Sequence, residues 1–195
     1  MLNKRAQTGF TLVEMLVVIS IAAILLWLGI PSMQEVIERN AVAGHVNTFI
    51  GSLRYARAEA IKRGVPVKMC RSTSAETAIT LKCATGTGSF DGWATGWIVF
   101  VDRNDNDTVN TDDILLRVQA PFPDSGGIQT KSGKAVKFVF RPTGLMSTGM
   151  SQLTFSARSD KPSRQRLVCV SMQGRARVMN DSMLDCNSGS GGRDV

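Results

Sequence analysis

The sequence predicts an α+β fold, in which one long N-terminal helix packs against an antiparallel β-sheet or sandwich. Three observations lead to this prediction. An apolar run fills residues 10–30, an apolar stripe of helical period follows it, and short alternating segments begin after Gly64. We therefore expect a helix with two distinct halves, followed by a single β-rich domain.

The first half of the helix, residues 10–30, contains Glu14 as its only charged residue. At about 1.5 Å per residue such a helix spans roughly 31 Å, the thickness of a bilayer core. A secretory signal peptide fits less well, because its apolar region is only about 7–15 residues long. We predict a transmembrane helix, with Lys4 and Arg5 on the cytoplasmic side and all later residues outside. Because an acid inside a bilayer is costly, Glu14 is expected to have a partner.

The second half of the helix, residues 31–64, is amphipathic. Its apolar residues recur at steps of four and three, which places them on one helical face. They are Val42, Val46, Phe49, Leu53, Ala56 and Ala60. Gly64 and Pro66 are typical helix-ending residues, and Lys62 and Arg63 suit the negative end of the helix dipole. This face is expected to pack on the sheet.

Residues 65–195 show the pattern of short strands separated by turns. Residues 97–101 are a continuous apolar run, typical of a buried strand, and alternating apolar residues mark strands near residues 65–69, 136–140, 153–155 and 167–170. Glycine-rich breaks at residues 85–88, 125–127 and 148–149 separate these segments. The predicted domain is large enough to have its own core.

Four cysteines, Cys70, Cys83, Cys169 and Cys186, favour two disulfides in a domain that faces an oxidising compartment. Three pairings are possible, and proximity in sequence favours Cys70–Cys83 with Cys169–Cys186. Each bond would close a short loop, worth about 3 kcal/mol in the chain-entropy model. A metal site is the alternative, but it requires closer cysteine spacing or a nearby histidine, and His45 lies far upstream. No metal is expected.

Residues 102–113 resemble a calcium-binding loop, with Asp102, Asn104 and Asn106 at alternating positions. However, Asp107 stands where such a loop needs glycine, and Asp113 stands where it needs a bidentate glutamate. An acidic hairpin loop is the alternative.

No group of residues favours catalysis or a bound cofactor, so we expect that the protein is not an enzyme. His45 lacks the partners of a catalytic triad. Trp93 and Trp97 can in principle stack on nucleic-acid bases. In a sheet protein such residues more often belong to the core.

The charge of the chain is unevenly distributed. The formal net charge is +7, residues 91–124 carry −5, and residues 131–195 carry +7. A basic C-terminal third favours an anionic partner such as nucleic acid, phospholipid or an acidic protein, and a merely soluble surface is the alternative.

Within this basic region, Arg175 and Arg177 are the leading candidates for anion binding. If residues 174–179 are extended, these side chains share one face about 6.6–6.8 Å apart, while Ala176 and Val178 turn to the core. Each guanidinium can then bind a phosphate of one nucleic-acid strand. Two solvated arginines on an edge strand are the alternative. Further basic candidates surround a predicted turn: Lys161, Arg164 and Arg166.

The string GFTLVE at residues 9–14 resembles the processing site of type IV prepilins and type II secretion pseudopilins. In that family a prepilin peptidase cuts after the glycine and methylates the new N-terminal residue. The resemblance implies a leader of residues 1–9, cleavage between Gly9 and Phe10, and a mature chain that starts at Phe10. It also implies that Glu14 pairs with the N-terminal amine of a neighbouring subunit during assembly.

Other strings resemble FimT/GspH-type minor pilins and pseudopilins, and this resemblance covers nearly the whole chain. The strings are AEAIKRG at 58–64, GW at 92–93, GWIVF at 96–100, DILLR at 113–117, FRPTG at 140–144 and GRARV at 174–178. The resemblance implies a periplasmic β-rich domain over residues 65–195. The string GRAR at residues 174–177 resembles the motif by which FimT-type pilins bind DNA during natural transformation. This resemblance implies that Arg175 and Arg177 are the DNA contacts.

We therefore expect a minor pilin of a type IV pilus that binds extracellular DNA without sequence preference. The alternative is the minor pseudopilin H of a type II secretion system, or a priming minor pilin with an assembly role only. Expected partners are the prepilin peptidase, other pilins or pseudopilins, DNA and the inner membrane. The expected location is the inner membrane, with a periplasmic C-terminal domain, and then the pilus or pseudopilus fibre.

Overall fold

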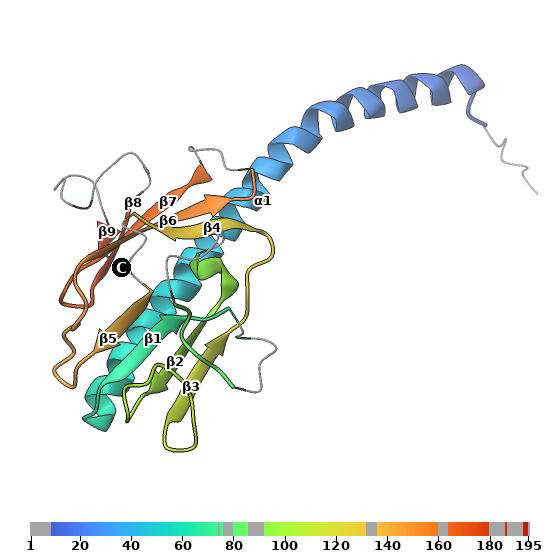
Figure 1. Ribbon diagram of the computed structural model, residues 1–195. Coiled ribbons are helices and arrows are strands. Elements are labelled where there is room, and N and C mark those ends of the chain that lie inside the picture. Colours follow the sequence, from blue (N-terminus) through green and yellow to red (C-terminus); the bar gives the residue numbers. More distant parts are fainter. Residues whose placement is uncertain are drawn as a thin grey trace, which may run out of the picture. The chain divides into compact units, whose positions relative to one another are not determined.

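The computed structural model describes residues 9–73, 75, 80–85, 92–131, 136–159, 164–179, 186 and 193–194, without the side chains of residues 28–32, 193 and 194. The chain forms two compact units, Met1–Ile37 and Glu38–Val195. Helix α1, Leu12–Arg63, contributes to both units. The second unit contains the core and every strand (Figure 1).

In the second unit, α1 buries the predicted apolar stripe. The six stripe residues, from Val42 to Ala60, are at most 3% exposed. The helix ends at Gly64, whose positive φ of 66° suits glycine and whose N–H donates to the carbonyl of Ala60 over 3.0 Å. The helical period in the sequence therefore predicted the packing face correctly.

The strands form two antiparallel sheets. The first has the order β3-β2-β1-β5, with β1 over Val67–Arg71, β2 over Trp97–Val101, β3 over Ile114–Gln119 and β5 over Lys137–Phe140. The second has the order β4-β6-β7-β8-β9, with β4 over Ser125–Thr130, β6 over Ser151–Ala157, β7 over Arg166–Val170, β8 over Ala176–Met179 and β9 over Arg193–Asp194. A short 3₁₀ helix, η1, covers Trp93–Thr95.

The core joins α1 to both sheets (Figure 1). At its centre, Phe49 of α1 makes edge contacts with Trp93, Trp97 and Phe155, with ring centroids 5.4, 5.4 and 5.6 Å apart. Edge-to-face packing of this kind stabilises cores beyond the area that it buries. Trp93 and Trp97 are 2% and 0% exposed, so the possibility that they stack on nucleic-acid bases is wrong.

The predicted fold class is confirmed, since a long N-terminal helix packs on antiparallel sheets in an α+β fold. The structure adds the division of the strands into two sheets, which the sequence pattern left open. That division gives the second sheet an outer face away from the core, and the basic hairpin β7–β8 lies in this sheet.

Candidate functional site

The turn between β7 and β8 positions the two candidate arginines. The N–H of Gly174 donates to the carbonyl of Ser171, and the N–H of Ser171 donates to the carbonyl of Arg175, both over 2.9 Å. Gly174 has a φ of +71°, and a Cβ on it would lie 2.8 Å from Cε1 of Phe140. Only glycine fits both the backbone conformation and the close approach. The turn is thereby held against the core immediately before Arg175.

The two faces of β8 separate the arginines from the core as the sequence predicts. Ala176 is 5% exposed in the core, and Val178 packs against the core. Arg177 lies on the opposite face, where it pairs across the ladder with Cys169 of β7. Arg175 precedes the strand and is exposed.

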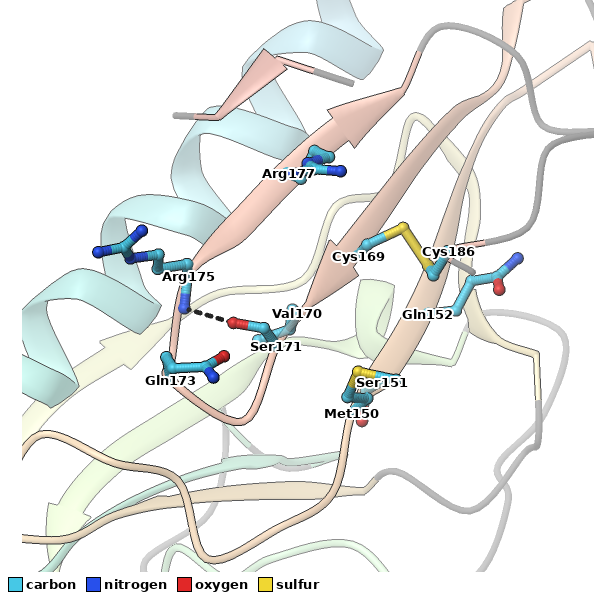
Figure 2. A pocket seen from close by; sticks show the side chains of 10 residues that line it. All are labelled: Met150, Ser151, Gln152, Cys169, Val170, Ser171, Gln173, Arg175, Arg177 and Cys186. Atoms are coloured by element: carbon cyan, nitrogen blue, oxygen red, sulfur yellow. Dashed lines mark hydrogen bonds between the residues drawn. A yellow bond between two sulfur atoms is a disulfide. The ribbon is translucent and has the colours of Figure 1, made fainter. Parts of the chain in front are cut away.

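A cavity of about 620 Å³ lies on this outer face, and Arg175 and Arg177 both line it. Its other lining residues come from β6, β7 and the turn, and Cys186 contributes from the C-terminal segment. Figure 2 shows Arg177 on β8, whereas Arg175 extends toward α1, on the side away from the Cys169–Cys186 bond. The two guanidinium groups therefore border one cavity without converging on a single point.

The other basic candidates do not join this pair. Arg164 forms an ion pair with Glu38 of α1 and donates to Ser159, and its side chain is only 11% exposed. Its charge is thus already compensated within the protein. Arg166 begins β7 and donates to the carbonyl of Gln165 over 3.3 Å. Lys161 lies outside the described residues.

Both disulfides follow the pairing that sequence proximity favours. Cys70 is bonded to Cys83, and Cys169 is bonded to Cys186. The second bond ties the C-terminal segment to β7, directly across the ladder from Arg177. The C-terminal segment then pairs with β8 through β9, with Arg177 opposite Asp194 in the register.

The acidic loop that resembles a calcium site already holds a cation of the protein itself. The ammonium group of Lys68 donates to Asp102 over 2.8 Å, to Asp105 over 2.9 Å and also to Asp107. Burial lowers the pKa of Lys68, but these hydrogen bonds outweigh it and raise the pKa above its usual range. Lys68 is 4% exposed in β1.

At the N-terminus, Thr11 caps the helix, because its Oγ1 accepts from the N–H of Glu14 over 3.2 Å. The side chains of Phe10 and Glu14 are exposed. Among the residues that the structure describes, no helix is long and apolar enough to cross a membrane. The membrane span over residues 10–30 and the roles of Gly9, Phe10 and Glu14 stay predictions from the sequence.

The basic residue of α1 that lies against the turn was not predicted from the sequence. Arg57 of α1 lies against the turn, since a Cβ on Gly174 would be 3.5 Å from its Cδ. Helical spacing puts Arg57 one position beyond the buried Ala56, at the edge of the packed face. That position was the only signal in the sequence.

Comparison with known proteins agrees with this fold and this N-terminus. The family model described as type II transport protein GspH matches residues 45–174, and the prokaryotic N-terminal methylation motif matches residues 4–30. The fold and the motif define a pilin-like subunit. The chain belongs to the GspH family.

Two solved structures with similar folds are crystal forms of the type IV minor pilin FimU from Pseudomonas aeruginosa strain PAO1. One has 17% identity and a TM-score of 0.52, covering 71% of this chain and 88% of that chain. The other has 16% identity and a TM-score of 0.49, covering 71% and 90%. At this identity the likeness shows the fold alone. No curated protein matches the chain.

The family assignment settles the broad class of the protein. It is a structural, non-enzymatic subunit of the minor pilin or pseudopilin type. Its methylation motif implies processing by a prepilin peptidase, and its family implies other pilins as partners.

Proposed function

We propose that this protein is a minor pilin that binds DNA through the phosphate backbone, with Arg175 and Arg177 as the main contacts. One observation carries the proposal. Both arginines line a single cavity of about 620 Å³, while Ala176 between them is buried in the core. The β7–β8 hairpin thus presents two cations to one cavity.

The chemistry of the site suits phosphate better than a base edge. Guanidinium groups hold phosphate oxygens by paired hydrogen bonds, and the tryptophans that could have stacked on bases are buried. Such binding ignores sequence and weakens with salt, because each neutralised phosphate releases counterions. One subunit is then expected to bind weakly, with Kd of about 10⁻⁴–10⁻⁶ M, and several subunits in a fibre gain avidity.

The test is a titration of labelled duplex DNA with the full chain in a non-ionic detergent, at several salt concentrations. With three to five phosphate contacts, the slope of log K against log salt is expected to be roughly −3 to −5. Arg175→Gln with Arg177→Gln should weaken binding to unrelated sequences equally and flatten the slope by about two.

A matched control removes the same charge elsewhere. Arg103 and Arg117 are exposed, the first after β2 and the second on β3, the edge strand of the other sheet. Arg103→Gln with Arg117→Gln should leave the slope nearly unchanged. If both double variants bind like the wild type, the two hairpin arginines are not DNA contacts.

The second candidate function is that of minor pseudopilin H in a type II secretion system, or a priming minor pilin, with no ligand. The GspH description of the matching family favours it. Deletion of the gene separates the two: loss of DNA uptake with normal pili and normal protein secretion supports the first function, and loss of pili or of secretion supports the second. Neighbouring minor pilin genes or a secretion operon give the same distinction.

The proposed location follows from the processing motif and the apolar composition of residues 10–30. We propose that these residues anchor the precursor in the inner membrane and that residues 65–195 lie in the periplasm. The two disulfides support an oxidising compartment. After cleavage the subunit would enter a pilus or pseudopilus fibre.

A further inference from the structure

A second hollow, of about 220 Å³, lies beside Arg175 on the side of α1. Arg54, Arg57 and Arg175 line it, and its remaining lining residues are apolar or glycine, including Leu53 and Ala176. We call this hollow the helix groove. Arg175 lines both the helix groove and the larger cavity, so the two hollows meet at this residue.

The side chain of Arg57 lies against two turns of the same kind. In one, the N–H of Gly144 donates to Arg141 over 2.8 Å, as Gly174 does to Ser171 in the other. Both glycines have positive φ, +78° and +71°. A Cβ on Gly144 would lie 3.1 Å from Nε of Arg57, so the guanidinium lies against this turn.

The arginines of the helix groove have no counter-charge among the residues that the structure describes. Arg54, Arg57 and Arg175 form no ion pair with any described residue. Elsewhere on the same unit, by contrast, Arg63 pairs with Glu59 and Arg164 pairs with Glu38. Three guanidinium groups around an apolar floor, with no described carboxylate paired to them, favour an anion from outside the chain.

We infer that the helix groove extends the DNA-binding surface and that Arg57 and Arg54 bind further phosphates of the strand held by Arg175 and Arg177. This inference rests on the proposed function. Arg54 and Arg57 are three residues apart on α1 and share a helical face. With Arg175 shared between the hollows, the four arginines form a continuous row that suits a polymer of repeated negative charge. The apolar floor can pack against deoxyribose carbons.

An acidic protein segment is the competing occupant. DNA is favoured because the groove meets the larger cavity at Arg175, whereas a short acidic segment would need only one hollow. The experiment below lets the two occupants give different results.

The experiment compares the wild type with a double variant that carries both Arg54→Gln and Arg57→Gln. It uses the full chain in non-ionic detergent and labelled duplex DNA. Loss of two phosphate contacts should flatten the salt slope by about two and weaken binding roughly tenfold per contact near 0.1 M salt. Arg57→Lys keeps the charge and should keep the slope. Arg103→Gln with Arg117→Gln is the charge-matched control.

The outcomes separate this inference from the function on which it rests. If the wild type does not bind DNA, both fail. If Arg175→Gln with Arg177→Gln weakens binding but the α1 variants keep the wild-type slope, the groove inference is overturned and the proposed function stands. Binding of polyglutamate that is lost in the α1 variants, with DNA binding intact, would assign the groove to an acidic protein.

Folding of the variants is checked by thermal unfolding. Arg57 contacts two turns, so Arg57→Gln can perturb them. Arg54 is exposed and touches neither turn glycine. Arg54→Gln alone should flatten the slope by about one, and an unchanged slope in this well-folded variant would overturn the inference.

Discussion

The turn conformation at Gly174 positions the two hairpin arginines, Arg175 and Arg177. The positive φ of Gly174 is strained for other residues, and an added methyl group would meet the ring of Phe140 at 2.8 Å. That ring is fully buried in the first sheet, so it has little room to move. The glycine of the GRAR string therefore has a packing reason of its own, separate from any role in binding.

We predict that Gly174→Ala destabilises the protein by roughly 1–3 kcal/mol, because it combines backbone strain with a clash. It should also weaken DNA binding, since the turn must move. Gly149→Ala is the control, because nothing lies within 4 Å of its added Cβ. Thermal unfolding checks the prediction, and equal melting temperatures for the two variants would contradict it.

Lys68 acts as the internal cation of the acidic loop. Its side chain is 5% exposed and that of Asp102 is 1% exposed, whereas Asp105 is 88% exposed. Removing the ammonium would leave a buried carboxylate without a counter-charge, which is more costly than never burying the pair. The position that a bound metal ion would take is thus filled by a side chain of β1.

We predict that Lys68→Met costs about 3 kcal/mol, the low end for buried pairs because part of the loop is exposed to solvent. Lys137→Met should cost less than about 1 kcal/mol, because Lys137 is 37% exposed and contacts Asp107 alone among these acids. Millimolar calcium or a chelator should leave the melting temperature of the wild type unchanged. A rise with calcium would show that a metal displaces Lys68.

The same loop makes the stability of the fold depend on pH in the acidic range. Burial raises the pKa of Asp102, but hydrogen bonds from Lys68 and from backbone N–H groups outweigh it and hold the pKa below its usual 3.8. A carboxyl group with a lowered folded-state pKa stabilises the fold above its unfolded pKa, and this contribution is lost as the pH falls through the folded value. The gap in melting temperature between wild type and Lys68→Met should therefore narrow below about pH 4.

At the scale of elements, the sequence predicted what local periodicity controls. The helical stripe from Val42 to Ala60, the buried run of β2 and the two faces of β8 all follow from the side-chain period of each element. The partners of buried charges did not follow, because Lys68 and Asp102 are distant in the sequence. The pairing of Arg164 with Glu38 of α1 and the position of Arg57 at the turn could not be predicted for the same reason, because the residues that meet are distant in the sequence.

The disulfide Cys169–Cys186 links these elements, since it joins β7 to the segment that continues into β9. Its loop spans 17 residues, so Cys169→Ser with Cys186→Ser should lose about 3 kcal/mol and lower the melting temperature by about 6–12 °C. Cys70→Ser with Cys83→Ser, with a loop of 13 residues, is the comparison. Peptide mapping without reductant should recover both bonds, and free thiols in periplasmic material would contradict this disulfide pairing.

At the scale of the whole molecule, the two compact units have different surfaces. The second unit buries its apolar residues, whereas residues 12–27 of the first expose theirs along the helix, with Phe10 80% exposed before it. Exposed apolar surface of this size marks an interaction site. The pilin family and the methylation motif point to other subunits as the partners that cover it in a fibre.

Glu14 is the one charge on that apolar surface, and its proposed pairing with the N-terminal amine of a neighbouring subunit gives the last prediction. Glu14→Ala should be cleaved normally, because the cut lies before Phe10, but it should be poorly incorporated into sheared fibres. Failure to enter the membrane would not explain such a loss, since removing the acid saves about 2.5–3.5 kcal/mol of insertion cost. Gly9→Val is the comparison, because it should block cleavage itself and leave a slower band on a gel. Normal incorporation of Glu14→Ala would refute the pairing, even with processing at Gly9 intact.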